Sequence, residues 1–131
     1  MKYFICAMDK INLAIPAEQT ERIIKVTRAQ NAIRETENQE VFISLPALFQ
    51  QKDISAPHGI VLKSKAGEPS AFTTVLLTTP VDLEQEIHEE EIYNLPKALS
   101  GVFKFFRGAY CTDKNMILIL DPEKLKDDCY D

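Results

Sequence analysis

The residues of this chain that could carry chemistry are two histidines, three cysteines and a cluster of carboxylates. His88 lies in the segment 86–91, whose four glutamates give it the composition of a carboxylate-rich metal site. Consecutive side chains on a strand and a turn point in different directions, so this spacing favours a solvated acidic face over a metal site. His58 has no cysteine or second histidine at ligand spacing. No metal or other cofactor is therefore expected.

Cys111 is the candidate nucleophile, but no histidine is close to it in sequence and nothing visible would lower its pKa. A structural thiol is the favoured interpretation. The three cysteines, an odd number without C-x-x-C spacing, suggest neither a disulfide framework nor a zinc knuckle. The four glycines are dispersed and form no phosphate-binding loop. These features predict a protein that is not an enzyme and that works in a reducing cytoplasm.

Composition limits the class of partner. With 131 residues, of which 45% are hydrophobic, the chain can bury the core of one domain. Its net charge is −5 and no cluster of Lys and Arg occurs, whereas nucleic-acid binding needs a concentrated basic surface. No stretch approaches the roughly 18 apolar residues of a membrane span. Neither nucleic acid nor membrane insertion is expected.

The segment 102–126 contains the clearest structural signals, a hairpin followed by a short helix. Met116 to Leu120 is an uninterrupted apolar run, which is typical of a strand covered on both faces. Asp121 occupies an N-cap position, and Pro122 suits the first position of a helix. A buried strand this late in the chain must be paired by earlier strands, so the last quarter is expected to close the fold.

The rest of the chain reads as short strands separated by turns. Extended segments are predicted at 2–8, 11–15, 22–26, 32–36, 41–43, 59–62, 73–79 and 81–88, with single helical turns at 17–19 and 45–49. The hairpin at the start is expected to turn one set of residues inward, with Phe4, Cys6 and Met8 opposite Ile11, Leu13 and Ile15. About nine short strands with few helices predict an all-β barrel or sandwich.

The aromatic segment Val102–Tyr110 leaves two interpretations open. Phe103 and Phe105 would share one face of a strand, and Phe106 and Tyr110 would share the other. Both faces need cover. The strand could lie between two packed barrels, or it could present an aromatic patch to a partner protein.

Four segments together resemble a known family. They are LAIPAEQTERI at 13–23, VFISLPALF at 41–49, the pair of strands and turn at 74–92, and the ending at 99–125 with its ILDPEKL. In this order they are similar to the CheW-like family, which comprises the coupling proteins of bacterial chemotaxis and the matching regulatory domain of the chemotaxis histidine kinase. The resemblance spans nearly the whole chain.

The resemblance implies one CheW-like domain over residues 1–131. Its fold would be all-β, with two small SH3-like five-stranded β-barrels packed side by side and short helices. The size of the chain predicts a division as well, because about nine short strands in a single sandwich would leave long edges exposed. We expect the barrels to divide near residues 79–80, with the N-terminal hairpin crossing over to help complete the second.

The implied function is a non-enzymatic adaptor that couples chemoreceptors to the histidine kinase. Its partners would be the regulatory domain of the kinase and the cytoplasmic tip of the receptor. By position, Thr20, Glu21 and Arg22 match the family's partner-binding strand, although Arg22 stands where the family has a glutamate and 31–36 lacks the family's glycine.

Two alternatives remain at this point. One is a divergent CheW-like regulator of another receptor–kinase system. The other is a small-ligand-binding β-barrel, which would require convergent polar groups in a cavity between the barrels.

Overall fold

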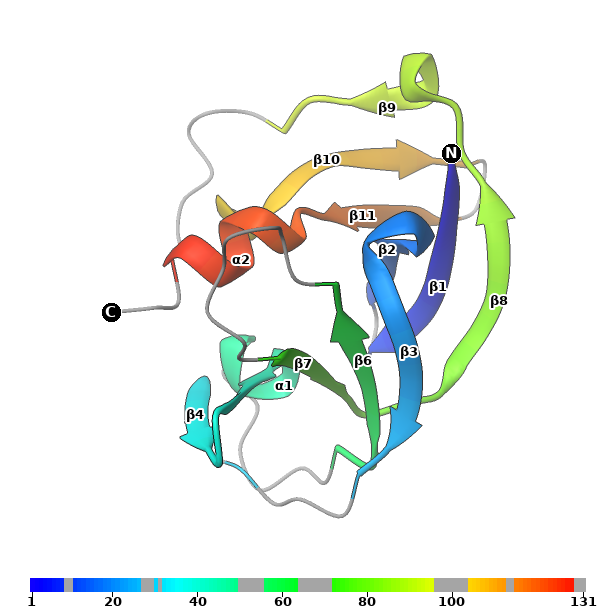
Figure 1. The fold of residues 1–131 in the computed structure, drawn as a ribbon. Helices are drawn as coiled ribbons and strands as arrows, with labels where there is room; N and C mark the ends of the chain where they lie inside the picture. Colours follow the sequence, from blue (N-terminus) through cyan, green and yellow to red (C-terminus); the bar gives the residue numbers. More distant parts are fainter. Residues whose placement is uncertain are drawn as a thin grey trace.

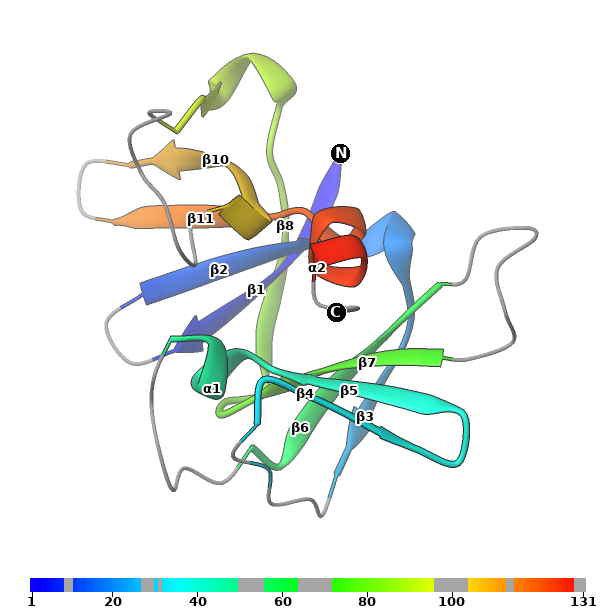
Figure 2. The same ribbon diagram turned by 90° about the vertical axis from the view of Figure 1, so that its left-hand side faces the viewer.

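The structure is a computed structural model that describes residues 1–8, 11–26, 30, 32–49, 56–63, 72–95, 104–112 and 115–128. Within these ranges the chain forms two β-sheets and a few short helices. Figure 2 shows the sheets as two layers, one above the other. The predicted all-β class is therefore confirmed.

The first sheet joins both ends of the chain. Its strands are β1 (Lys2–Met8), β2 (Ile11–Pro16), β8 (Val81–Glu86), β9 (Ile92–Tyr93), β10 (Phe106–Cys111) and β11 (Met116–Leu120). Their order is β8-β1-β2-β11-β10-β9, and the β2–β11 pair is parallel. The N-terminal hairpin thus lies between β8 and β11, as the predicted crossing requires (Figure 1).

The second sheet is built from the middle of the chain. Its strands are β3 (Thr20–Lys25), β4 (Arg34–Glu37), β5 (Glu40–Ser44), β6 (His58–Leu62) and β7 (Phe72–Leu77), in the order β3-β6-β7-β5-β4. The β4–β5 turn holds Asn38 and Gln39 at positive φ, 51° and 66°, as a tight hairpin turn requires. The chain then passes from β7 to β8 in the first sheet, where the Thr79 hydroxyl donates to the Ala7 carbonyl.

The helices are single turns or little more, and two have the caps expected of their sequences. They are η1 (Ala17–Gln19), α1 (Leu45–Leu48), η2 (Glu89–Glu91) and α2 (Pro122–Asp128). The predicted N-cap of α2 is confirmed, because Asp121 Oδ1 accepts from the backbone N–H groups of Glu123 (3.1 Å) and Lys124 (3.4 Å). Ser44 Oγ caps α1 in the same way, accepting from Ala47 N at 3.2 Å. None of the helices in the described ranges is long and apolar enough to cross a membrane.

One core fills the space between the sheets. The first sheet contributes Cys6, Leu13, Ile15, Leu118 and Leu120, the second contributes Val41, Ile43, Ile60, Leu62, Val75 and Leu77, and α1 and α2 add Leu45, Leu48 and Leu125. The predicted inward face of the N-terminal hairpin is confirmed for Cys6, Leu13 and Ile15, whereas Phe4 is only half-buried. Tyr3, Ile5 and Ala14 are buried on the other face, in a second cluster with Ile87, Ile117 and Ile119. The segment after β8 contributes to this second cluster through Ile87, and Ile92 of β9 packs against it.

The closed SH3-like barrels are not confirmed. In the described part of the chain, β8 and β9 stand at the edges of a six-stranded sheet, and β3 and β4 at the edges of a five-stranded one. Closure would require those edges to pair with each other.

The structure decides in part between the two interpretations of the aromatic segment. Phe105 and Phe106 are both buried in the core, which supports the packing interpretation for these two rings. Phe103 lies outside the described residues.

Candidate partner-binding surface

The predicted contact residues follow a tight corner between the two sheets. Pro16 ends β2, η1 makes one turn, and Thr20 begins β3. The Thr20 hydroxyl donates to the Pro16 carbonyl at 3.1 Å, and the Thr20 N–H donates to the Ala17 carbonyl. Lys63 N–H donates to the Gln19 carbonyl at 2.9 Å, which ties the corner to the end of β6. Thr20 is buried, so its side chain fixes the corner and leaves surface contact to the residues that follow.

Glu21 and Arg22 lie on the exposed part of β3, at an irregularity in its pairing with β6. Thr20 pairs with Leu62 and Arg22 with Val61, so Glu21 is an extra residue between two consecutive pairs. A bulge of this kind bends the strand and re-aims its side chains. Both charged groups are thereby presented to solvent at one place.

Arg22 also reaches across the sheet to an aromatic ring. Its guanidinium carbon lies 5.9 Å from the centre of the Phe72 ring, within the range of a cation–π contact. Phe72 is 42% exposed, and Ile23, on the opposite face of β3, is 48% exposed. Arginine is among the residue types that dominate binding energy at protein interfaces, and phenylalanine is enriched there.

β3 stands at the edge of its sheet, so its outer backbone groups pair with no strand of the described chain. Such an edge can accept a strand from another protein, whereas bulges and charges limit promiscuous pairing. β3 combines a bulge, three charged side chains and the exposed Ile23 in six residues. This arrangement suits selective contact with a protein partner.

The other sequence candidates are not brought together. His58 begins β6 in the second sheet, whereas His88 precedes η2 beside the first. Cys111 is exposed at the end of β10, Cys6 is buried in the core, and Cys129 lies outside the described residues. Among the described residues, no group of three or more His, Cys, Asp or Glu side chains could hold a metal ion.

Two features of this surface were missed by sequence reasoning. The Arg22–Phe72 contact joins distant segments, and no local pattern announces it. The exposure of Ile23 follows from the edge position of β3, which only the strand order reveals. A β-branched residue in a predicted strand is otherwise expected to be covered.

Comparison with known proteins identifies the fold. No protein-family model matches the sequence, and no curated protein matches it. Solved structures do match, and one of them places the two-sheet architecture in the class of CheW-like folds. One of them is the crystal structure of the scaffolding protein TtCheW from Thermoanaerobacter tengcongensis. It aligns with a TM-score of 0.68 and 14% identity over 95% of this chain and 86% of that chain. At this identity the likeness establishes a CheW-like fold, as the sequence resemblance predicted.

Proposed function

We propose that this protein is a non-enzymatic adaptor of bacterial chemotaxis, which couples chemoreceptors to the histidine kinase in the cytoplasm. The observation that carries the proposal is the match of 95% of the chain to the fold of a scaffolding protein. In this proposal the two sheets correspond to the two SH3-like barrels of the family, dividing near residues 79–80. The partners are the regulatory domain of the kinase and the cytoplasmic tip of the receptor.

The packing between the sheets supports an adaptor over a ligand-binding barrel. A ligand site needs a cavity with a few convergent polar groups. The space between these sheets is instead filled by apolar side chains of both sheets and both α-helices. Chemistry or ligand binding at that position would require the core to open, whereas an adaptor needs only its outer surfaces.

The contact surface in this proposal is the start of β3, with Thr20 holding the corner and Glu21 and Arg22 touching the partner. The exposed Arg22 side chain carries a positive charge where the family has a glutamate. A matched partner would therefore present an acidic group opposite Arg22. Charge pairs of this kind set specificity and the rate of association, and salt weakens them.

The test is the charge reversal Arg22→Glu, measured by titration calorimetry against the cognate kinase regulatory domain and the receptor tip. We expect roughly tenfold weaker binding of one partner at low salt, about 1.4 kcal/mol, because attraction becomes repulsion. The deficit should shrink as salt is added. The free energy of unfolding should change by no more than about 0.5 kcal/mol, as for most surface substitutions.

Lys124→Glu is the matched control, because it makes the same change in net charge at an exposed position on α2. It should leave both affinities unchanged. If Arg22→Glu also binds both partners like the wild type, the start of β3 is not the contact surface. If the folded wild-type protein binds neither partner, the adaptor role itself is wrong, and a regulator of another receptor–kinase system becomes the better account.

A further inference from the structure

A hollow of about 410 Å³ is lined by residues of η2 and of strands of the first sheet, whereas β3 belongs to the second sheet. It is bounded by η2, β9 and the end of β10, which Figure 1 shows together at the top of the molecule. Its lining consists of two carboxylates, two phenol rings, a thiol and a hydroxyl: Glu90, Glu91, Tyr93, Tyr110, Cys111 and Thr112. None of these residues belongs to the surface proposed above.

Gly108 fixes the position of β9 beside this hollow. A Cβ atom at residue 108 would lie 2.6 Å from Ile92 Cγ2 and 2.7 Å from the Tyr93 carbonyl oxygen, distances too short for any side chain. The absence of a side chain lets β9 pair closely with β10, Tyr93 opposite Ala109 and Ile92 opposite Tyr110. The backbone that carries Tyr93 is therefore held close to β10, beside the hollow.

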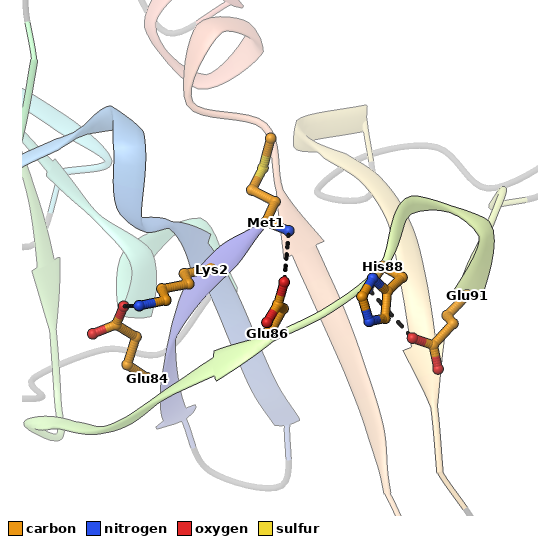
Figure 3. A network of polar contacts seen from close by, with 6 residues as sticks. All are labelled: Met1, Lys2, Glu84, Glu86, His88 and Glu91. Atoms are coloured by element: carbon orange, nitrogen blue, oxygen red, sulfur yellow. Dashed lines mark hydrogen bonds and ion pairs between the residues drawn. The ribbon is translucent and has the colours of Figure 1, made fainter.

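The two carboxylates come from a turn that is held by its own hydrogen bonds. Glu91 N–H donates to the His88 carbonyl at 2.9 Å, and His88 N–H donates to Glu91 Oε1 at 3.4 Å (Figure 3). The nearby Arg107 guanidinium pairs with Glu89. Within the described residues, neither Glu90 nor Glu91 has an ion pair, so the hollow retains negative charge.

The lining matches the chemistry of a guanidinium group. Carboxylates bind guanidinium through paired N–H···O bonds, and the faces of tyrosine rings attract the same planar cation. We propose that this hollow is a docking site for an arginine side chain of a partner protein. The net charge of −5 favours approach of a basic segment.

The occupant is a protein side chain because the site is too open for a small ligand. Small-molecule sites bury about 70–90% of their ligand. Here Glu90 and Glu91 are exposed and Tyr93 is 67% exposed, so the rim covers one side of a guest. An exposed tyrosine at the rim of a charged hollow suits an arginine anchored by the rest of its own protein. This inference does not depend on the chemotaxis partners or on β3.

The experiment uses the full chain, labelled with ¹⁵N, and the capped peptide N-acetyl-Gly-Arg-Gly-amide. We expect saturable amide shifts confined to residues 90–93 and 110–112. The matched peptide with citrulline in place of arginine has the same shape without the charge. It should bind at least about tenfold more weakly, because charge-assisted hydrogen bonds are the stronger ones.

Two double variants distinguish binding in the hollow from attraction by the overall negative charge of the protein. Glu90→Gln with Glu91→Gln should abolish the shifts. Glu84→Gln with Glu86→Gln on β8 makes the same change in net charge and should leave binding intact. On β8, Glu84 lies 3.8 Å from Lys2 Nζ, and Glu86 lies 3.9 Å from the N-terminal nitrogen (Figure 3).

Tyr93→Phe should retain binding, since it keeps the ring face, whereas Tyr93→Ala should weaken it.

Three results would overturn the proposal. The arginine and citrulline peptides could give equal shifts. The double variant at Glu84 and Glu86 on β8 could weaken binding as much as the double variant at Glu90 and Glu91. Free arginine could bind more than about tenfold tighter than the capped peptide, which would make this a site for the free amino acid. Failure of the adaptor role would affect none of these measurements, because no chemotaxis partner is present.

Discussion

Tyr3 has a buried hydroxyl group that makes no hydrogen bond in the described structure. Its side chain is fully buried in the second cluster, with Ile87, Ile117 and Ile119. Burial raises the pKa of the Tyr3 phenol, the Arg107 guanidinium opposes that shift, and the carboxylates of Glu89 and Glu18 add to it. The neutral form of the phenol is thus favoured among the apolar side chains of the second cluster.

Replacing Tyr3 by phenylalanine is therefore expected to cost no stability. An unpaired buried hydroxyl is unfavourable, so Tyr3→Phe should leave the free energy of unfolding unchanged or raise it by up to about 1 kcal/mol at pH 7. Urea unfolding checks this. A loss of about 1 kcal/mol or more would mean that the hydroxyl has a partner and that the packing described is wrong.

The free energies of unfolding of the wild type and of Tyr3→Phe should differ increasingly at alkaline pH. The unfolded phenol loses its proton near its ordinary pKa of about 10, while the folded phenol, whose pKa is raised, keeps it. The unfolded state then binds fewer protons than the folded state, so wild-type stability falls as pH rises through this range. Tyr3→Phe lacks that contribution. Its stability should fall less steeply between about pH 9 and 11.

Single residues were predicted unevenly, for a physical reason. The exposure of Glu21 and Arg22 follows from charge, because unpaired charged side chains are rarely buried. Thr20 was expected at the contact surface, but its hydroxyl is turned inward to the Pro16 carbonyl. That bond depends on the corner at η1, whose geometry a sequence pattern does not specify.

Among the secondary-structure elements, β9 depends most on one neighbouring residue. Gly108→Ala should cost about 1–3 kcal/mol of unfolding free energy, because the new methyl group would collide with the Tyr93 carbonyl as well as with Ile92. Gly59→Ala is the control. There a Cβ would approach side-chain methyl groups of Thr74 and Val26, both at 3.0 Å, which can shift.

The control should therefore lose less stability than Gly108→Ala in urea unfolding. Equal losses in the two variants would show that β9 does not lie against β10 as described. A smaller loss at Gly108 than at Gly59 would show the same.

Elements with strong local signals were predicted well. The apolar run at 116–120, the aspartate cap and the proline at the first helical position all correspond to β11 and α2. β9 was missed because two residues cannot carry a periodic pattern. The final hairpin begins at Phe106, later than expected, since β-propensity alone does not determine where pairing begins.

The arrangement of the two sheets was beyond local sequence signals. The parallel pairs β2–β11 and β5–β7 join segments that are distant in sequence, and alternation of apolar residues does not reveal a partner strand. Two packed units were predicted from the family resemblance and from the number of short strands, and neither argument specified which strands pair. The core between the sheets buries one face of β1 and β2, and the second cluster buries the other.

The adaptor account requires this chain to join two other proteins and to change neither chemically. Its acidic charge, its filled interior and its exposed edge strand are all compatible with binding through outer surfaces. A scaffold of this kind must bind each partner without displacing the other. Two separate heats of binding are therefore the expected signature.

The most direct measurement is a sequential titration in a calorimeter with the wild-type protein. The cognate kinase regulatory domain is added first, and the cytoplasmic tip of the receptor is then added to the complex. The adaptor role predicts saturable binding in both steps. Each Kd should be roughly micromolar, which corresponds to a binding free energy of about −8 kcal/mol. Absence of binding in both steps, when the protein in the calorimeter is folded, would contradict the adaptor role.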